Sequence, residues 1–239
     1  MAEAVGNTTQ TSEGAAGRPY ALGGIAERAA AVVQGFFPGE EGGPAVAGIL
    51  SGRVDPSGRL PASVPRRPGQ PGTYLQPRAG HSSTWSAADP TPQFPFGHGL
   101  TWTRFRYDAL EVDASAPTDG TVRVRATVLN AGERAGTEVV QLYLSDPVAA
   151  SIRPVRWLAG WARVRLDPGA SACVEFEVHA DRTSFTGPGL RRVVEPGEIE
   201  VAVGPSSGDL PLRGSFTLTG PERTPGPDRV LTVPVTVTR

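Results

Sequence analysis

The sequence predicts a mainly β fold, a β-sandwich preceded by a partial α/β part, and two observations support this. From residue 105 onwards, apolar and polar residues alternate in about seven short runs separated by turn residues, as in strands that bury one face. Before residue 102, an apolar run leads through a glycine turn into a short helical pattern, which indicates an α/β unit. The 30 glycines and 24 prolines fit a chain with many turns.

Composition excludes some classes of partner. The 239 residues carry a formal net charge of -1, so neither nucleic acid nor an anionic membrane would be attracted electrostatically. No apolar run approaches the roughly 20 residues that span a bilayer, and the N-terminal segment lacks the features of a secretion signal, so we expect a cytoplasmic chain. Cys173 is the single cysteine, which leaves no disulfide and no zinc-binding cysteine cluster. We expect neither a metal nor a cofactor.

The N-terminal region divides at about residue 17. Residues 1–17 are small and polar without periodicity, and we expect a disordered arm. Residues 18–102 are expected to form the partial α/β part with a long loop. It opens with an extended piece at Arg18–Leu22 and a short helix at Ile25–Ala30.

A strand, a turn and a helix follow in residues 31–50. The run Ala31–Phe37 is apolar and rich in β-branched and aromatic residues, and it ends at a Pro-Gly pair, which predicts a buried strand. The acidic turn EEGG at residues 40–43 leads into Pro44–Leu50. Acidic residues ahead of the first turn and an early proline predict a helix start there, and Ser51-Gly52 ends the helix.

The rest of the α/β part contains turns and extended chain. Residues 55–58, Asp-Pro-Ser-Gly, predict a turn. Arg59–Pro65 suits an edge strand or an extended segment, because its prolines have no N–H for a sheet. Residues 66–92 form a long loop by composition. Within it, Tyr74 and Trp85 would either contact a sugar through their rings or pack the loop against its own domain.

The second half predicts an immunoglobulin-like sandwich over residues 103–220. Its strand-like runs are Phe105–Val112, Val122–Asn130, Glu138–Asp146, Leu158–Leu166, Ala172–His179, Ile199–Val203 and Leu212–Leu218. Residues 221–239 form a tail in which Arg229–Thr238 also alternates like a strand. The sequence does not identify the partner of this last run.

Several tracts resemble glycoside hydrolase family three, the β-glucosidase and β-xylosidase family. FPGEEGG at residues 37–43 and DPSGRLP at 55–61 resemble YPGEEGG and NPSGRLP of its C-terminal α/β domain. FPFGHGLTW at residues 94–102 resembles the tract that joins this domain to a terminal fibronectin type III-like domain, and GTEVVQLYLSD at 136–146 resembles that domain. The resemblance implies a truncated α/β sandwich domain followed by a fibronectin type III-like sandwich.

One departure concerns the start of the α/β sheet. The family has a run of valines, isoleucines and leucines where this chain has Asn7–Ala16. We therefore expect the parallel sheet to begin part-way through, with an open edge and exposed apolar faces. The resemblance thus implies an incomplete protein.

The resemblance also implies that the catalytic residues lie outside this sequence. The family carries its nucleophilic Asp in an N-terminal barrel and its acid/base Glu upstream of the Ser-Gly-Arg-Pro tract. The adjacent Glu40 and Glu41 do not form a pair facing across a sugar, and the helix dipole accounts for acids at this position. His98 lies between two glycines without an Asp-Ser constellation, which favours packing or loop bonding. A structural role is assigned to Glu40, Glu41, Gly42, Gly43, Arg59 and His98.

Three functional hypotheses remain. In the first, the chain is the C-terminal portion of a β-glycosidase acting on terminal β-linked glucose or xylose, inactive alone, with the catalytic barrel as its partner in the same or another chain. In the second, it is a stand-alone module that binds carbohydrate or protein. In the third, it is itself a hydrolase with a rearranged site.

Overall fold

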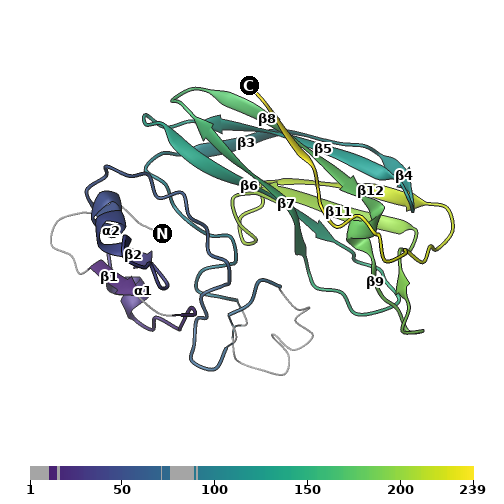
Figure 1. Cartoon of the computed structure of the whole chain (residues 1–239), viewed down its shortest axis with the longest axis horizontal. Helices are drawn as coiled ribbons and strands as arrows, with labels where there is room; N and C mark the ends of the chain where they lie inside the picture. Colours follow the sequence, from purple (N-terminus) through teal and green to yellow (C-terminus); the bar gives the residue numbers. More distant parts are fainter. Residues whose placement is uncertain (1–10, 15–16, 71, 76–88, 90) are drawn as a thin grey trace.

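The computed structural model describes the chain except for residues 1–10, 15–16, 71, 76–88 and 90. It has two parts (Figure 1). A small α/β part lies on one side, and a larger β-sandwich lies on the other. The described residues between α2 and β3 run from the first part onto the second.

Two parallel strands and two helices make up the α/β part. They are β1 (Thr11–Gly14), α1 (Ile25–Arg28), β2 (Ala31–Gln34) and α2 (Gly42–Leu50). β1 pairs with β2 in parallel, with Thr11 opposite Ala31. The prediction of a disordered arm was therefore wrong for Thr11–Gly14. Backbone groups make the hydrogen bonds of a strand pair, so a strand can form from residues that show no apolar pattern in the sequence. Residues 1–10 lie outside the described residues.

The predicted strand and helix near residue 40 are both present with shifted ends. β2 ends at Gln34 rather than Phe37, and Phe36 has a left-handed backbone (φ 53°) that does not continue a strand. α2 begins at Gly42, two residues before the expected proline. A Cβ on Gly42 would lie 2.6 Å from Cγ of Pro38, so this packing requires glycine.

The second half is a two-layer sandwich, as expected. One sheet has the order β4-β12-β11-β6-β7, and the other has the order β13-β8-β5-β3. The strands are β3 (Phe105–Val112), β4 (Ser115–Pro117), β5 (Thr121–Asn130), β6 (Gly136–Ser145), β7 (Trp157–Leu166), β8 (Ser171–His179), β11 (Gly197–Gly204), β12 (Leu212–Thr219) and β13 (Val235–Thr238). Alternation on β5 places Val122, Val124, Ala126 and Val128 in the core.

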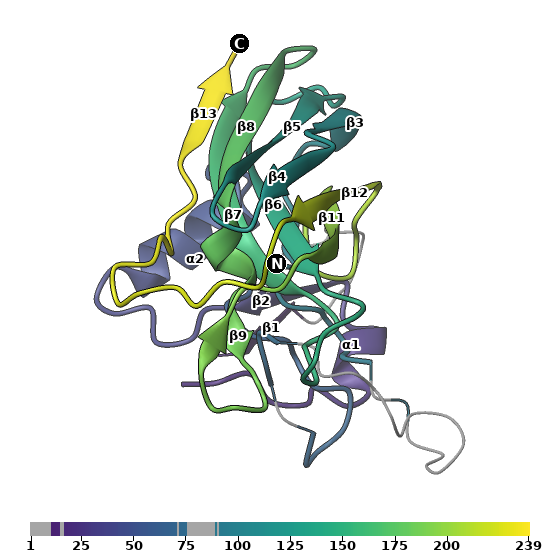
Figure 2. The same ribbon diagram turned by 90° about the vertical axis from the view of Figure 1, so that its right-hand side faces the viewer.

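The structure adds elements that the sequence did not predict and resolves one open question. The short elements β4, η1 (Ala180–Thr183), β9 (Phe185–Thr186) and β10 (Arg192–Val193) carry too few residues for a periodic pattern. The tail run ends as β13, which pairs antiparallel with β8 and places Val235 opposite Phe176. Figure 2 shows this yellow strand lying along the edge of the β8 sheet.

Candidate functional site

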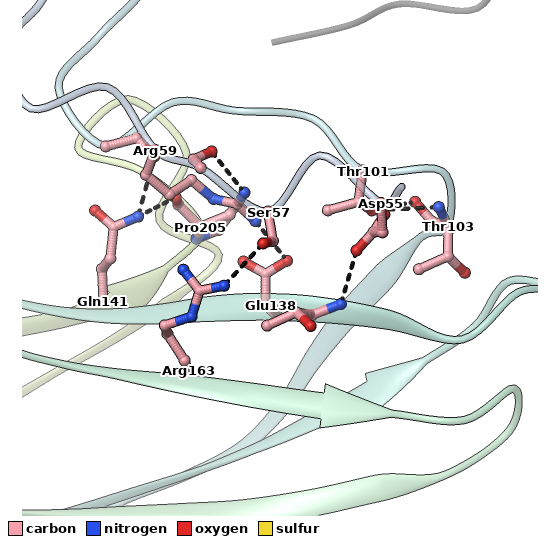
Figure 3. A network of polar contacts seen from close by, with 12 residues as sticks. Asp55, Ser57, Arg59, Thr101, Thr103, Glu138, Gln141, Arg163 and Pro205 are labelled. Carbon is pink, nitrogen blue, oxygen red and sulfur yellow. Dashed lines mark hydrogen bonds and ion pairs between the residues drawn. The ribbon is translucent and has the colours of Figure 1, made fainter. Parts of the chain in front are cut away.

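A polar junction joins the α/β part to the sandwich, and Asp55 stands at one end of it. Its Oδ1 accepts the backbone N–H of Trp102 at 3.1 Å, and its Oδ2 accepts the N–H of Thr137 at 3.0 Å. In Figure 3, Glu138, Gln141 and Arg163 extend from the sheet towards the segment that carries Asp55, Ser57 and Arg59. One carboxylate therefore fixes the turn at residues 55–58, the start of β6 and the segment of residues 94–102, which we call the linker.

Arg59 makes the buried ion pair of this junction. Its Nη2 lies 3.1 Å from Oε2 of Glu138, and the two side chains are 7% and 4% exposed. Tyr107 donates its hydroxyl to Oε1 of Glu138 at 3.0 Å. Burial, followed by the charge of Glu138, raises the pKa of Tyr107 well above its ordinary value. The tyrosine therefore stays a hydrogen-bond donor, and both oxygens of Glu138 are occupied.

Gln141 and Tyr143 extend the junction along β6. They alternate with the core residues Val140 and Leu142, so they face outwards, and yet they are buried. Gln141 donates to the carbonyl oxygens of Gly97, at 3.1 Å, and Pro205. Phe96 and Tyr143 meet edge to face. The linker thus covers the outer face of this strand.

His98 packs within the linker. Its ring stacks on Phe94 with centroids 5.4 Å apart, and its backbone carbonyl accepts the N–H of Leu60 at 2.9 Å. Burial lowers the pKa of His98, with a smaller contribution from Arg59. The imidazole is therefore neutral near pH 7.

The acidic turn lies away from the junction. Glu40 and Glu41 are exposed, as is Gly43, while Gly42 is buried at the start of α2. Glu41 occupies the N-cap position without a side-chain capping bond. These residues form the entry to α2.

Of the two loop aromatics, the structure describes Tyr74 but not Trp85. Tyr74 is 63% exposed and meets Phe96 edge to face with ring centroids 6.4 Å apart. It lines a cavity of about 770 Å³ between the linker and the sandwich, which Thr73, Phe96, Tyr143 and Arg156 also line. Trp85 lies outside the described residues. The sugar-contact assignment stays a prediction for both.

The carboxylates of the junction already accept hydrogen bonds, which limits the reactions that they could catalyse. A retaining glycosidase needs one carboxylate free to attack and a second to donate a proton. Glu138 and Asp209 line one cavity of about 360 Å³, but both oxygens of Glu138 accept hydrogen bonds. Within the described residues, no three His, Cys, Asp or Glu side chains gather to hold a metal, and no helix is long and apolar enough to cross a membrane.

The fold and junction define an α/β part that is fastened to a fibronectin-type sandwich by buried polar contacts. Residues 14–102 match the glycosyl hydrolase family 3 C-terminal domain, and residues 138–207 match the fibronectin type III-like domain. The chain belongs to glycoside hydrolase family 3, in which it corresponds to the C-terminal part of the larger enzymes. The resemblance noted in the sequence is thereby confirmed.

Named relatives agree with this assignment. A β-xylosidase of Formosa agariphila is 37% identical over 196 residues, which cover 80% of this chain and 27% of the relative. A periplasmic β-glucosidase of Salmonella typhimurium is 36% identical over 220 residues, which cover 84% of this chain and 28% of the relative. The structure of an Erythrobacter marinus β-glucosidase matches with a TM-score of 0.80 and 39% identity, and the match covers 87% of this chain and 28% of that protein. This chain thus spans about a quarter of the length of these relatives.

Proposed function

We propose that this chain is the non-catalytic C-terminal part of a family 3 β-glycosidase and that it supports a catalytic barrel carried by another segment or chain. The whole enzyme would hydrolyse terminal β-linked glucose or xylose, the sugars named for the relatives. The chain would supply the end of the α/β domain together with the sandwich that holds it in place.

The observation that carries this proposal is the uncovered apolar surface of the α/β part. Phe37 is 79% exposed, and Tyr20, Ile25 and Val54 are also exposed. The helix α2 is apolar along most of its length and yet buries only Gly42 and Gly48. A helix that is apolar on most sides is normally covered by protein, so this surface fits contact with further strands and helices.

The experiment is an activity assay with an aryl β-glucoside and an aryl β-xyloside. We expect no turnover by the purified chain alone, and turnover when it is mixed with a fragment that carries the barrel and the preceding α/β strands. Phe37→Asp should weaken association with this fragment. Val148→Asp is the matched control, because Val148 is 86% exposed but lies in the loop after β6.

One result would overturn the proposal. If the chain alone hydrolysed either substrate and Glu40→Gln or Glu41→Gln abolished the activity, the chain would be a hydrolase with its own site.

A further inference from the structure

A second cavity, of about 500 Å³, lies where the start of β7, η1, β10 and the C-terminal tail meet. Four arginines line it: Arg153, Arg182, Arg192 and Arg229. We call it the arginine cavity. Its lining also includes Tyr74, Leu75 and Phe96.

The positive charge of the arginine cavity is not balanced by its lining. Asp181 is its single carboxylate, and that group is already engaged. One oxygen pairs with Arg223, and the other accepts the backbone N–H of Val230 at 2.8 Å. Arg153 has a carboxylate partner outside the lining, because its Nε lies 3.6 Å from Oδ2 of the buried Asp146. The other three guanidinium groups line a cavity in which no carboxylate is available to them.

Two of the arginines are fixed by the fold. Arg153, 8% exposed, lies between the rings of Trp157 and Phe185, 4.7 and 4.6 Å from their centroids. Its Nη2 donates to the carbonyl of Thr183. Arg182 donates to the carbonyls of Leu158 and Ala159. These contacts hold both guanidinium groups in place beside the cavity.

The other two arginines keep donors for a ligand. Arg192 donates through Nη1 to Ser184, and the described residues use none of its other guanidinium N–H groups. Arg229 makes no hydrogen bond or ion pair with any described residue, although it is only partly exposed. Because a guanidinium presents a planar fork of donors, each can hold a carboxylate through two parallel bonds.

We propose that the arginine cavity binds a sugar that bears a carboxylate, that is, a uronic acid. The carboxylate lies between Arg192 and Arg229, and the ring lies against the wall formed by Tyr74 and Phe96. Pockets for small ligands have volumes of about 300–1,000 Å³, so the cavity has room for a single sugar ring. Such a site would extend the protein to acidic glycans.

The test is titration of the full 239-residue chain by NMR or calorimetry with glucuronate, glucose and acetate. Glucuronate should bind at least about tenfold more tightly than either glucose or acetate, because only glucuronate has both the carboxylate and the ring. Binding should weaken as salt is raised, because the contact is ionic. Equal binding of glucuronate and glucose would overturn the proposal, and so would equal binding of glucuronate and acetate.

Variants separate the arginine cavity from general surface charge. Arg192→Gln and Arg229→Gln should each weaken glucuronate binding about tenfold, as expected for one lost charged contact. Arg191→Gln is the matched control, because it removes the same charge from the neighbouring residue, which is exposed and does not line the cavity. Equal losses in all three variants would overturn the proposal. An acidic peptide that competes with glucuronate and binds more tightly would identify a protein partner instead.

Discussion

Arg59 and Glu138 form a buried ion pair at 3.1 Å although they are 79 residues apart and belong to different parts of the fold. Arg59 comes directly after the turn that follows α2, and Glu138 comes from the start of β6. Two charges removed from water cost several kcal/mol each, a cost that their attraction and the bond from Tyr107 offset. The pair fixes how the α/β part sits on the sandwich.

Arg59→Ala should destabilise the full chain by about 3–5 kcal/mol, because it leaves Glu138 charged and buried without its partner. The measurement is urea unfolding followed by tryptophan fluorescence. Glu111→Ala is the control: Glu111 pairs with Arg125 at 3.6 Å on the surface, so its loss should cost less than about 1 kcal/mol. Equal effects of the two substitutions would contradict this account of the junction.

Asp55→Ala should loosen the junction without unfolding the sandwich. It removes the acceptor of two backbone N–H groups, each worth about 1–3 kcal/mol when left unpaired. Hydrogen exchange should accelerate at the amides of Trp102 and Thr137 and stay unchanged at Val124 in the core. Ser57→Ala, which removes only an exposed bond from Arg163, should leave all three amides unchanged.

The sequence predicted most of the fold because alternation of apolar and polar residues indicates a strand with one buried face. It therefore indicated β5 and β8, whose polar residues face solvent. On β6 apolar residues lie on both faces between Val139 and Leu144, with Gln141 as the polar exception. Apolar residues on both faces of a strand were a signal for a second covering layer, and the linker is that layer.

The junction itself could not be predicted in detail. The motif identified Arg59 as structural, but its partner Glu138 is a long-range contact without local periodicity. The arginine cavity is less visible still, because Arg153, Arg182 and Arg192 come from separate elements. Only the folded chain brings their charges together.

Asp181 contacts Arg223 and Val230 of the C-terminal tail. This contact should make the stability of the fold depend on pH. Burial alone would raise the pKa of this carboxyl, but hydrogen bonds from Arg223 and Val230 outweigh burial and lower it. A lowered folded-state pKa means that the contribution is complete above the unfolded value of about 3.9 and is lost as pH falls towards the folded value. Asp181→Asn should therefore reduce the melting temperature at pH 7 and have less effect below about pH 3. An equal reduction of the melting temperature at both pH values would show that the charge of Asp181 does not contribute to stability.

Removal of residues 229–239 should cause the chain to associate. β13 covers the edge of β8, and its loss exposes unpaired backbone groups in the row from Cys173 to Phe176. Light scattering should show oligomers that the full chain does not form. Cys173→Lys in the shortened chain should suppress them, because a charge on an edge strand opposes edge-to-edge pairing.

A fragment of residues 103–239 should fold alone, and Glu138→Gln should affect the full chain much more than the fragment. The fragment lacks Arg59 and also Gly99–Thr101, which line the cavity around Glu138 in the full chain. Its Glu138 carboxylate therefore gains access to water, and a neutral amide should change the fragment's melting temperature little. In the full chain the same change breaks the buried ion pair and should lower the melting temperature. Calorimetry of the four proteins gives the comparison, and equal shifts in both would show that Arg59 and Glu138 are not coupled.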